Sequence, residues 1–589
     1  MSPIARTLLI FVGLTLGAGV LAFGVGAPPE NCPEITVAQT ERAASGAVDW
    51  LVDNQHPDGT WLYEYDRVAD VDTDDYNIVR HAGVMSSLYQ AGARGYDGAF
   101  DSADRGLVWA LDNLVERHGW AAVTTTDRVQ AGTNALLLAA LAERRLYTGD
   151  DTYDDLMAKL GRFLTSQVEP SGALLAYYNL ASDEPRAETY SIYYTGEAYW
   201  ALGRLHRIDS EAGWGAVADL VGNYMATDRD NAEDVWPQLA DHWSGYGLAE
   251  TAAFPDRPTG QPLTEAELVF VQRQGGLIGQ RVRSISQRYG PWGAAVRGTF
   301  TVRGGGYGVF GEGLTGLWRA AELDERLANE RDELGERAAC IAGLAIEAQV
   351  TATEASEYAV PGKVEGAWFI DDLTRMDDQQ HALSALLLTI PILEAAPFDA
   401  GHPAPPAWLW FLVVLAAINP IRAGLSIPRR PRLNDRVAIT ALGSLLAAAV
   451  LLAVGATSGW LLGVADASRP AMRLAAGGLL LLSAGVDMAT KPRHDLPELP
   501  GFKAALVPVA VPLFARPAMI VAGLAIVADH GIALYAGALA AAVAAMMVAA
   551  LAPPRTDAQR LVMVWTGRLL SAIAVAGSIA LIADAVFDI

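Results

Sequence analysis

Acidic, histidine and tyrosine side chains recur near the starts of several predicted helices between residues 37 and 400. Two carboxylates could cleave a glycosidic bond, one as a protonated acid and the other as an ionised base or nucleophile. Histidine or tyrosine could instead move the α-proton of a uronic acid, as a lyase or epimerase does, while a cation holds the sugar carboxylate. The candidates for catalysis are Glu197, Glu312, His81, His242, Asp378 and Tyr194. The candidates for substrate binding are Asp74, Asp75, Arg80, Asp241, Trp243, His381 and Trp61.

These candidates also have a structural interpretation. Asp74, Asp241 and Asp377 could cap helices, and the histidines could hydrogen-bond neighbouring helices. An inner ring of helices without a task would favour Ala, Leu and Gly, so the recurrence of polar residues favours a functional face. The sequence has no His-x-x-x-His pair, phosphate-binding loop or Gly-x-Ser-x-Gly turn. We therefore predict no metal and no cofactor, with Ca²⁺ on an Asp cluster as the alternative.

The residues 306–311 spell Gly-x-Gly-x-x-Gly, the fingerprint of dinucleotide-binding loops. Such a loop needs a strand before it and a helix after it, whereas the surrounding pattern is helical. With Gly304 and Gly305, the run is therefore predicted to be a flexible lip over the functional face.

Apolar residues three and four apart predict helices throughout residues 37–400. One set is interpreted as outer helices: 36–54, 101–117, 153–167, 212–225, 265–285 and 334–349. Between them lie segments richer in small residues, which suit an inner ring: 80–91, 131–147, 195–207, 242–254, 309–323 and 379–393. Each helix pair must stack on its neighbours to bury its apolar face. The alternation predicts an all-α protein with an (α/α)6 toroid.

Two resemblances support the toroid. The segment 55–61, Gln-His-Pro-Asp-Gly-Thr-Trp, resembles the Gln-x-x-x-Gly-x-Trp turns of terpene cyclase toroids, which implies a structural turn. The segments 74–83, 193–197, 241–243 and 377–381 together resemble an uncharacterised bacterial group of carbohydrate-associated (α/α)6 proteins. This second resemblance implies that the toroid binds or modifies carbohydrate.

A membrane part is indicated by composition, since 52% of the 589 residues are hydrophobic and only 19% are charged. The net charge of −24 and the scattered arginines argue against binding of nucleic acid. Apolar stretches of about 20 residues suit helices that cross a bilayer. They lie at 7–27, 408–425, 436–456, 472–490, 504–527, 532–551 and 562–583. The sequence thus predicts one N-terminal transmembrane helix and a six-helix C-terminal bundle.

The basic residues predict the orientation of these spans. Placing Arg6 in the cytoplasm puts residues 28–406 outside and returns Arg429, Arg430 and Arg432 to the inside, as the positive-inside rule requires. We therefore expect a multi-pass protein of the cytoplasmic (inner) membrane, with its large domain on the periplasmic or extracellular side. The first span is either a retained anchor or a cleaved signal. The predicted domains are 1–29, 30–400 and 401–589.

The C-terminal spans contain Asn-Pro-Ile at 419–421, LLLLSAGVDM at 479–488 and VPVAVPLFARP at 507–517. Over residues 407–589 they resemble the MarC family of integral membrane proteins. The resemblance implies two three-helix halves of opposite topology, with interrupted helices at Asn419 and Arg516. The chain departs from the family pattern at Arg422, where a small residue is usual, and at Ala515-Arg516-Pro517, where Gly-Pro is usual.

Asn419 and Arg516 are therefore the candidates for a transport site, because a guanidinium within an apolar span is costly. The alternative is that Arg516 pairs with an acid such as Asp487 and only locks two half-helices together.

The chain has two cysteines, Cys32 before the first outer helix and Cys340 within the last one. These helices become neighbours when six pairs close into a ring, and an oxidising compartment permits a disulfide between them. The alternative is two unrelated buried thiols.

These features predict a membrane-tethered protein that acts on envelope or extracellular polysaccharide as a glycoside hydrolase, lyase or epimerase. The alternative is a non-enzymatic glycan- or solute-binding module coupled to a transporter-like or scaffolding bundle, so enzyme activity stays open. The expected partners are the lipid bilayer and a carbohydrate polymer, with an envelope complex or a homo-oligomer as further alternatives.

Overall fold

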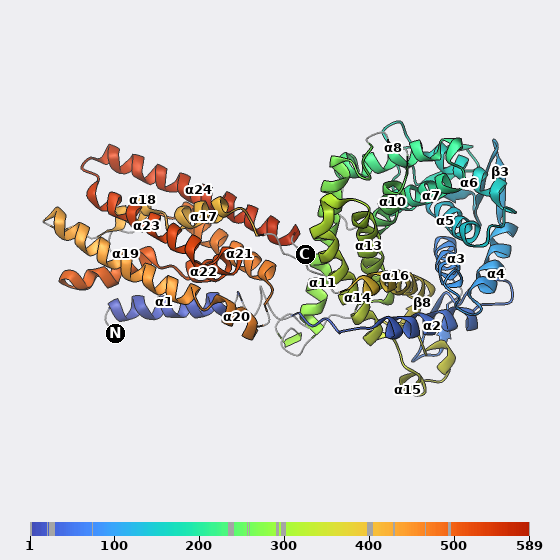
Figure 1. Ribbon diagram of the computed structural model, residues 1–589, viewed down its shortest axis with the longest axis horizontal. Coiled ribbons are helices and arrows are strands. Elements are labelled where there is room, and N and C mark those ends of the chain that lie inside the picture. The colour runs from blue at the N-terminus through green and yellow to red at the C-terminus, as the bar shows by residue number, and fades with distance from the viewer. Residues whose placement is uncertain are drawn as a thin grey trace. The chain divides into compact units, whose positions relative to one another are not determined.

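The computed structural model describes residues 3–20, 22, 30–73, 75–233, 241–255, 257, 260–289, 294–295, 302–396, 404–427, 430, 432–465, 467–492, 496 and 498–587. They form two compact units (Figure 1). One comprises Cys32–Ser286 and Phe300–Gly401, and the other comprises Met1–Asn31, Gln287–Thr299 and His402–Asp588.

The first unit is a closed ring of helix pairs. Its inner helices are α3 (Ile78–Gly92), α5 (Ala131–Thr148), α7 (Tyr194–Ile208), α10 (His242–Ala252), α13 (Gly304–Glu322) and α16 (Met376–Ala395). Each packs against the next, and α16 packs against α3, which closes the ring (Figure 1). The outer helices are α2 (Val37–Asp53), α4 (Ala99–Asp112), α6 (Asp154–Gln167), α8 (Trp214–Thr227), α11 (Glu265–Tyr289) and α14 (Ala328–Ala348). The predicted (α/α)6 toroid is confirmed.

Short antiparallel strands connect the helices. The sheets are β2 (Val71–Asp72), β1 (Glu64–Asp66) and β8 (Leu373–Arg375); β3 (Leu114–Arg117) and β4 (Trp120–Val123); and β5 (Arg128–Gln130), β6 (Tyr177–Asn179) and β7 (Glu184–Pro185). The prediction that the second outer helix continues to residue 117 is wrong, because α4 ends at Asp112 and a hairpin follows. His118 and Gly119 both have positive φ and form its two-residue turn, a conformation that matches the twist of paired strands.

The glycine run predicted to be a flexible lip is instead the first turns of α13. Glycine is needed there because α13 and α16 approach closely. A Cβ on Gly304 would lie 3.0 Å from Cβ of Asp378, and one on Gly308 would lie 2.1 Å from the carbonyl carbon of His381. The small residues of the inner ring thus set the spacing of the helices that carry the candidate site.

Cys32 and Cys340 form a disulfide, with their Cα atoms 4.8 Å apart. The predicted bridge is therefore confirmed. It ties the segment before the first outer helix, α2, to the last outer helix, α14, across 308 residues of sequence.

The second unit holds the apolar helices. They are α1 (Pro3–Gly19), α17 (Ala407–Ile418), α18 (Pro420–Ser426), α19 (Leu433–Gly455), α20 (Ser458–Ala465), α21 (Arg469–Ala489), the π-helix η6 (Leu506–Phe514), α22 (Pro517–His530), α23 (Ile532–Leu551) and α24 (Asp557–Phe587). Within the described residues, five spans are long and apolar enough to cross a membrane: Ala407–Ser426, Leu433–Gly455, Arg469–Ala489, Ile532–Leu551 and Asp557–Val586. A sixth is the pair Gly501–Phe514 and Pro517–His530, bent by 67°.

These spans agree with the six predicted for the C-terminal bundle. Of the predicted N-terminal span, residues 7–20 are helical and α1 packs against α22, while most of residues 21–29 lies outside the described residues. Two interruptions fall where the sequence predicts them, at Asn419, which adopts φ of 51°, and at Ala515–Arg516, between η6 and α22.

Candidate active site

The first turns of the inner helices meet at one end of the ring, because outer and inner helices alternate along the chain and the inner helices therefore all run in the same direction. This end carries most of the predicted site residues of the toroid. Arg80 and His81 lie in α3, Tyr194 and Glu197 in α7, His242 and Trp243 in α10, and Asp378 and His381 in α16.

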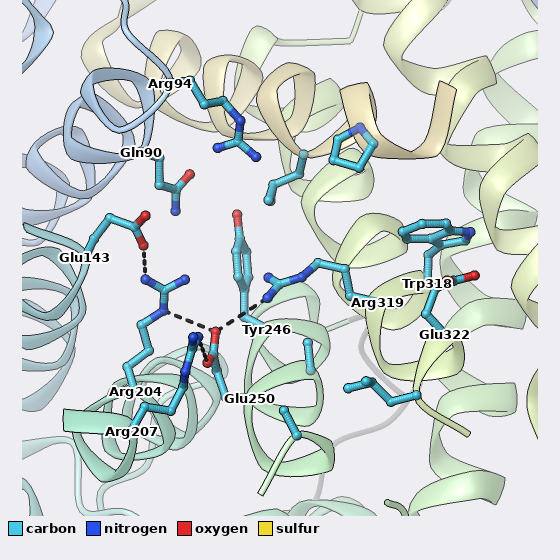
Figure 2. Close-up of a pocket in the computed structure, with 15 residues that line it drawn as sticks. Gln90, Arg94, Glu143, Arg204, Arg207, Tyr246, Glu250, Trp318, Arg319 and Glu322 are labelled. Carbon is cyan, nitrogen blue, oxygen red and sulfur yellow. Dashed lines mark hydrogen bonds and ion pairs between the residues drawn. The ribbon is translucent and has the colours of Figure 1, made fainter. Parts of the chain in front are cut away.

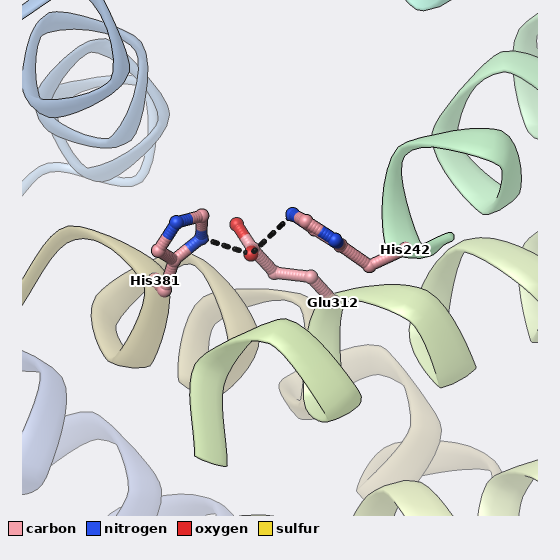
Figure 3. Close-up of side chains that lie close together, drawn as sticks. All are labelled: His242, Glu312 and His381. Atoms are coloured by element: carbon pink, nitrogen blue, oxygen red, sulfur yellow. Dashed lines mark hydrogen bonds and ion pairs between the residues drawn. The ribbon is translucent and has the colours of Figure 1, made fainter. Parts of the chain in front are cut away.

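Three of the predicted site residues lie close together (Figure 3). His242, Glu312 and His381 come from the successive inner helices α10, α13 and α16. His381 Nδ1 donates to Glu312 Oε2 at 2.6 Å, and His242 Nε2 lies 4.0 Å from the same oxygen. The two imidazole centroids are 5.4 Å apart. The sequence predicts all three residues for this face, and the structure brings them together.

The two histidines have opposite protonation tendencies. Burial, and then the charge of His381, lower the pKa of His242 well below its usual value, so this imidazole is neutral. Neither ring nitrogen of His242 has a hydrogen-bond partner among the described residues. Burial alone would also lower the pKa of His381, but contact with Glu312 outweighs it and raises that pKa. One buried base and one buried acid therefore lie side by side.

Tyr246 and two tryptophans support this cluster. Tyr246 lies one helical turn beyond His242, and its hydroxyl donates to Glu312 Oε1 at 3.1 Å. Both oxygens of Glu312 are thus occupied. Trp243 stacks on Trp200 at 5.5 Å between centroids, and its ring lies 4.5 Å from that of His242. The sequence reasoning missed Tyr246, although its position four residues after a candidate histidine places it on the same helix face.

Glu197 is a second buried acid at this end of the ring. Burial, and then the neighbouring charge of Asp241, raise its pKa to about 8. Its Oε2 atom has no hydrogen-bond partner among the described residues. A Cβ on Gly132 of α5 would lie 2.3 Å from both Glu197 Oε2 and Tyr194 Cδ1, so these two side chains pack together over that glycine. Glu197 is therefore protonated at neutral pH.

Asp241 caps α10. Its Oδ1 atom accepts from the backbone amides of Trp243 and Ser244 at 3.0 and 3.3 Å, and its Oδ2 atom pairs with Arg229 at 2.5 Å. Burial raises its pKa, and Arg229 opposes that shift. These contacts give Asp241 the structural role that the sequence also allows.

Asp378 and Arg80 also have protein partners. Asp378 accepts from the backbone amides of Arg375 at 3.0 Å and Gly305 at 2.9 Å, so it joins the first turns of α16 and α13. Arg80 pairs with Asp377 at 2.9 Å and donates to the hydroxyl of Tyr63. The charge of Asp378 also contributes to the raised pKa of His381. The roles of Asp378 and Arg80 in substrate chemistry stay predictions.

His81 lies apart from the cluster, between aromatic rings. Its Nε2 atom donates to the carbonyl of Gly106 at 2.9 Å, and its Nδ1 atom accepts from the hydroxyl of Tyr76 at 2.6 Å. The ring centroids of Trp61 and Trp109 lie 4.9 and 4.4 Å from the centroid of the His81 imidazole. Burial lowers the pKa of His81 to about 4, so it is neutral. These contacts match the structural interpretation of both His81 and Trp61.

The other predicted residues lie at the edge of the ring or outside the described residues. Tyr194 is half-buried, with its ring 6.2 Å from that of Tyr177. Asp75 is exposed, and Asp74 lies outside the described residues.

His242, Glu312 and His381 could also bind a metal ion. Their nearest donor atoms lie within 4.8 Å of one another, and two imidazoles with one carboxylate form a common ligand set for transition metals. However, the 2.6 Å contact between His381 and Glu312 is a hydrogen bond and requires a proton between the two atoms. We therefore interpret the cluster as an acid–base site, and the absence of a central metal stays a prediction.

In the second unit, Arg516 pairs with Asp487, as the structural alternative predicts. Arg422 pairs with the same carboxylate at 3.1 Å, so Asp487 forms ion pairs with two arginines. Arg516 also donates to the carbonyl of Ile418 at 3.4 Å, which places it beside the interruption at Asn419. The side chain of Asn419 donates to the Gly567 carbonyl at 2.8 Å. The transport roles of Asn419 and Arg516 stay predictions.

A second charged cluster in this unit was missed by the sequence reasoning. Arg473 and Asp529 are fully buried and paired at 3.0 Å, and the indole of Trp410 donates to Asp529 at 3.2 Å. The sequence offered a signal for both Arg473 and Asp529, because each is a charged residue within or beside an apolar span.

The comparisons with known proteins agree with the division of the chain into a toroid and a membrane unit. The model of the MarC family integral membrane proteins matches residues 407–584, which confirms the resemblance of the C-terminal bundle. This region is therefore a multi-pass membrane region of that type. No curated protein matches the chain in sequence.

Solved structures resemble the toroid. A cellobiose 2-epimerase from Spirochaeta thermophila is 15% identical, with a TM-score of 0.43, and the match covers 61% of this chain and 97% of that one. A D-mannose isomerase is 12% identical, with a TM-score of 0.41 and coverage of 61% and 97%. A GH76 α-mannanase from Bacteroides thetaiotaomicron is 10% identical, with a TM-score of 0.40 and coverage of 60% and 96%. At these TM-scores the assignment of the toroid rests on the closed ring of helices described above.

Proposed function

We propose that the toroid is an acid–base enzyme that moves a proton at a sugar carbon next to a carbonyl, as epimerases and isomerases do. The observation that carries this proposal is the pair His242 and His381, one neutral and one protonated, beside the single carboxylate of Glu312. General acid–base catalysis requires a base and an acid that reach the same substrate atoms, and this pair supplies both.

The chemistry needs no other reactant. Neutral His242 removes the proton from the carbon next to the carbonyl, and the C–H electron pair forms a carbon–carbon double bond. The carbonyl electrons move to oxygen, which takes a proton from His381. Return of a proton to the other face of the same carbon, while the oxygen gives its proton back to His381, gives the epimer. Return of a proton to the former carbonyl carbon, while the hydroxyl on the neighbouring carbon loses its proton to His381 and becomes the new carbonyl, gives the isomer. Glu312, held by Tyr246, keeps His381 protonated in the resting state.

The aromatic side chains around the two histidines suit a sugar substrate. Trp243 lies against His242, and the exposed ring of Tyr193 lies 5.9 Å from the same imidazole. Binding sites for small molecules combine aromatic walls with a few polar groups of this kind.

The experiment measures deuterium uptake from D2O into a panel of reducing mono- and disaccharides by the full-length protein in detergent. We expect uptake at the carbon next to the carbonyl, and His242→Gln or His381→Gln should reduce it at least 100-fold. His118→Gln, which changes an exposed histidine on the β3–β4 hairpin, is the control and should leave the rate unchanged. Uptake by His381→Gln at the wild-type rate would refute the proposal.

Glycoside hydrolysis is the second candidate, and the raised pKa of Glu197 favours it, because a buried protonated carboxyl can assist a leaving group. A hydrolase also needs an ionised carboxylate across the bond, and Glu312 is held by His381 and Tyr246. Glu197→Gln separates the candidates: it should abolish release of reducing ends by a hydrolase and spare deuterium uptake by an epimerase. A glycan-binding module would show neither reaction and would keep its affinity in the variant.

We further propose that the toroid lies outside the cytoplasmic membrane. The basic loop around Arg430 supports this orientation, and so does the disulfide between Cys32 and Cys340, since disulfides persist in oxidising compartments. Reporter fusions at residues 250 and 496 should report opposite sides of the membrane. Two fusions that report the same side would contradict this layout.

A further inference from the structure

A cavity lies at the end of the inner ring opposite the histidine cluster. Figure 2 shows the residues that line it. Its volume is about 660 Å³, and residues from the last turns of all six inner helices line it. The charged side chains in its wall are Arg94, Glu143, Arg204, Arg207, Glu250, Arg319 and Glu322. None of them belongs to the site described above.

Three of the arginines surround one buried carboxylate. Glu250 lies 3.1 Å from Arg204, 2.9 Å from Arg207 and 3.7 Å from Arg319. Burial would raise the pKa of Glu250, but the three guanidinium groups lower it to about 2. Glu250 is therefore ionised, and it cannot neutralise three cations.

Arg94 adds a further positive charge at the rim. Among the described residues, its guanidinium has no ion pair and donates to no carbonyl. Glu322, the third carboxylate of the wall, does not neutralise it, because Glu322 pairs with Arg331 at 3.3 Å. Figure 2 shows Arg94 and Arg319 pointing into the same space. Partial desolvation, and then the like charge of Arg319, lower the pKa of Arg94.

The wall therefore carries more positive than negative charge. Glu143 pairs with Arg204, and Glu322 pairs with Arg331, which does not line the cavity, so the four arginines of the wall share the two carboxylates Glu143 and Glu250. The carbonyl ends of the inner helices offset part of this excess. The remainder is concentrated on Arg94 and Arg319, the two arginines with the weakest protein contacts.

The lining of the cavity also has an apolar part. It is formed by Trp318, Leu323, Leu388 and Pro391. A cavity of this size with apolar walls and a few converging polar groups is typical of sites for small organic molecules. Guanidinium groups favour phosphate and carboxylate, which they bind through paired N–H donors.

We propose that this cavity binds a small organic anion, with Arg94 and Arg319 holding its phosphate or carboxylate group and the wall at Trp318 packing against its body. The site is separate from the proposed acid–base chemistry, and its test is binding rather than turnover. Tyr246 lies between the two sites, since it lines the cavity and donates to Glu312.

The test is isothermal titration of the full-length protein in detergent with inorganic phosphate, glucose 6-phosphate, glucuronate and glucose, in chloride buffer of constant ionic strength. We expect saturable binding of at least one anion that Arg94→Ala weakens, whereas any binding of neutral glucose should be the same in the wild type and in Arg94→Ala. The anion that binds tightest distinguishes a phosphate site from a carboxylate site.

Arg94→Ala is the main variant, because among the described residues the Arg94 side chain has no hydrogen-bond or ion-pair partner whose loss would disturb the fold. It should weaken binding at least 10-fold, and Arg94→Lys should recover only part of that loss. Arg42→Ala, which removes an exposed arginine of α2, should bind as the wild type does. His242→Gln should also keep its affinity, so failure of the proposed catalysis and failure of this site are distinguishable. No binding by the wild type, or equal binding by Arg94→Ala, would overturn the proposal.

Discussion

Glu197 and Glu250 show how far the surroundings of a residue decide its chemistry. Both carboxyls are buried in the inner ring, yet the pKa of Glu197 is raised to about 8 and that of Glu250 is lowered to about 2. No cation among the described residues lowers the pKa of Glu197, so desolvation dominates. Glu250 has three arginines, whose attraction outweighs the same desolvation. One residue type thus supplies an acid at one end of the ring and a structural anion at the other.

We expect Glu197→Gln to stabilise the toroid at neutral pH. The pKa of Glu197 is higher in the folded than in the unfolded state, so its contribution to stability is full below pH 4.5 and is lost as the pH rises through about 8. At pH 7 the variant should gain roughly 3 kcal/mol, since each pKa unit corresponds to about 1.4 kcal/mol. Denaturant unfolding between pH 5 and 8, followed by tryptophan fluorescence, measures this difference.

Glu250→Gln is the matched control and should behave in the opposite way. The pKa of Glu250 is lower in the folded state, so its contribution is full above pH 4.5 and is lost as the pH falls toward 2. Its removal should destabilise the toroid at pH 7, because three arginines lose their carboxylate. Equal pH dependence of the wild type and Glu197→Gln would contradict the assignment.

Asp487 should matter more than Arg516 for the stability of the membrane unit. Arg516→Ala leaves Asp487 paired with Arg422, whereas Asp487→Asn deprives two arginines of their partner. We expect a loss of about 3–5 kcal/mol for Asp487→Asn and a clearly smaller loss for Arg516→Ala. Thermal unfolding in detergent compares them. A larger loss in Arg516→Ala would show that Arg422 does not hold the carboxylate.

At the scale of helices, the site depends on the close approach of α13 and α16. Glu312 lies in α13 and His381 in α16, and their 2.6 Å hydrogen bond requires the two helices to touch. Glycines of α13 permit this contact, as the 2.1 Å approach of a Cβ on Gly308 to the His381 backbone shows. Close packing of these two helices therefore sets the protonation of His381.

Gly308→Ala should separate α13 from α16. We expect a loss of stability of roughly 1–3 kcal/mol or more, together with loss of deuterium uptake, because the added methyl group displaces His381 from Glu312. Gly362→Ala is the control, since a Cβ there would meet no atom within 4 Å. Thermal unfolding and the uptake assay measure both effects. Normal stability in Gly308→Ala would show that the helices can move apart at no cost.

At the scale of the whole chain, the two units are built differently: one is a closed ring of helices and the other is a bundle of apolar spans. The toroid closes through contacts between α16 and α3, and the disulfide fastens its first segment to its last outer helix. The apolar spans of the second unit form a multi-pass region of the MarC type. The sequence separation of 308 residues between Cys32 and Cys340 means that the bridge restricts the unfolded chain strongly.

Cys32→Ser should therefore lower the stability of the toroid by about 2–5 kcal/mol. Cys340→Ser should have a similar effect, and the double variant should add little, because all three lack the same bond. A reductant should lower the stability of the wild type and leave the variants unchanged. Mass spectrometry under non-reducing conditions checks the bond directly, and two free thiols in the wild-type protein would contradict it.

The sequence by itself determined the helices, the apolar spans and the pairing of inner with outer helices, because these depend on the periodicity of nearby residues. It also placed His81 and His242 alike, each in the first turn of an inner helix. Only the tertiary structure separates them. His81 is held by Trp61, Trp109 and the Gly106 carbonyl, whereas His242 lies beside Glu312.

The cavity at the other end of the ring, with Arg94, Arg319 and Glu250, was likewise invisible in the sequence. Its residues come from helices far apart in the chain, and no local pattern relates them. Protonation and charge pairing depend on burial and on partners brought in by ring closure, as the 69-residue separation of Glu312 and His381 illustrates. Local pattern therefore decides which elements form, and long-range packing decides which of their side chains do chemistry.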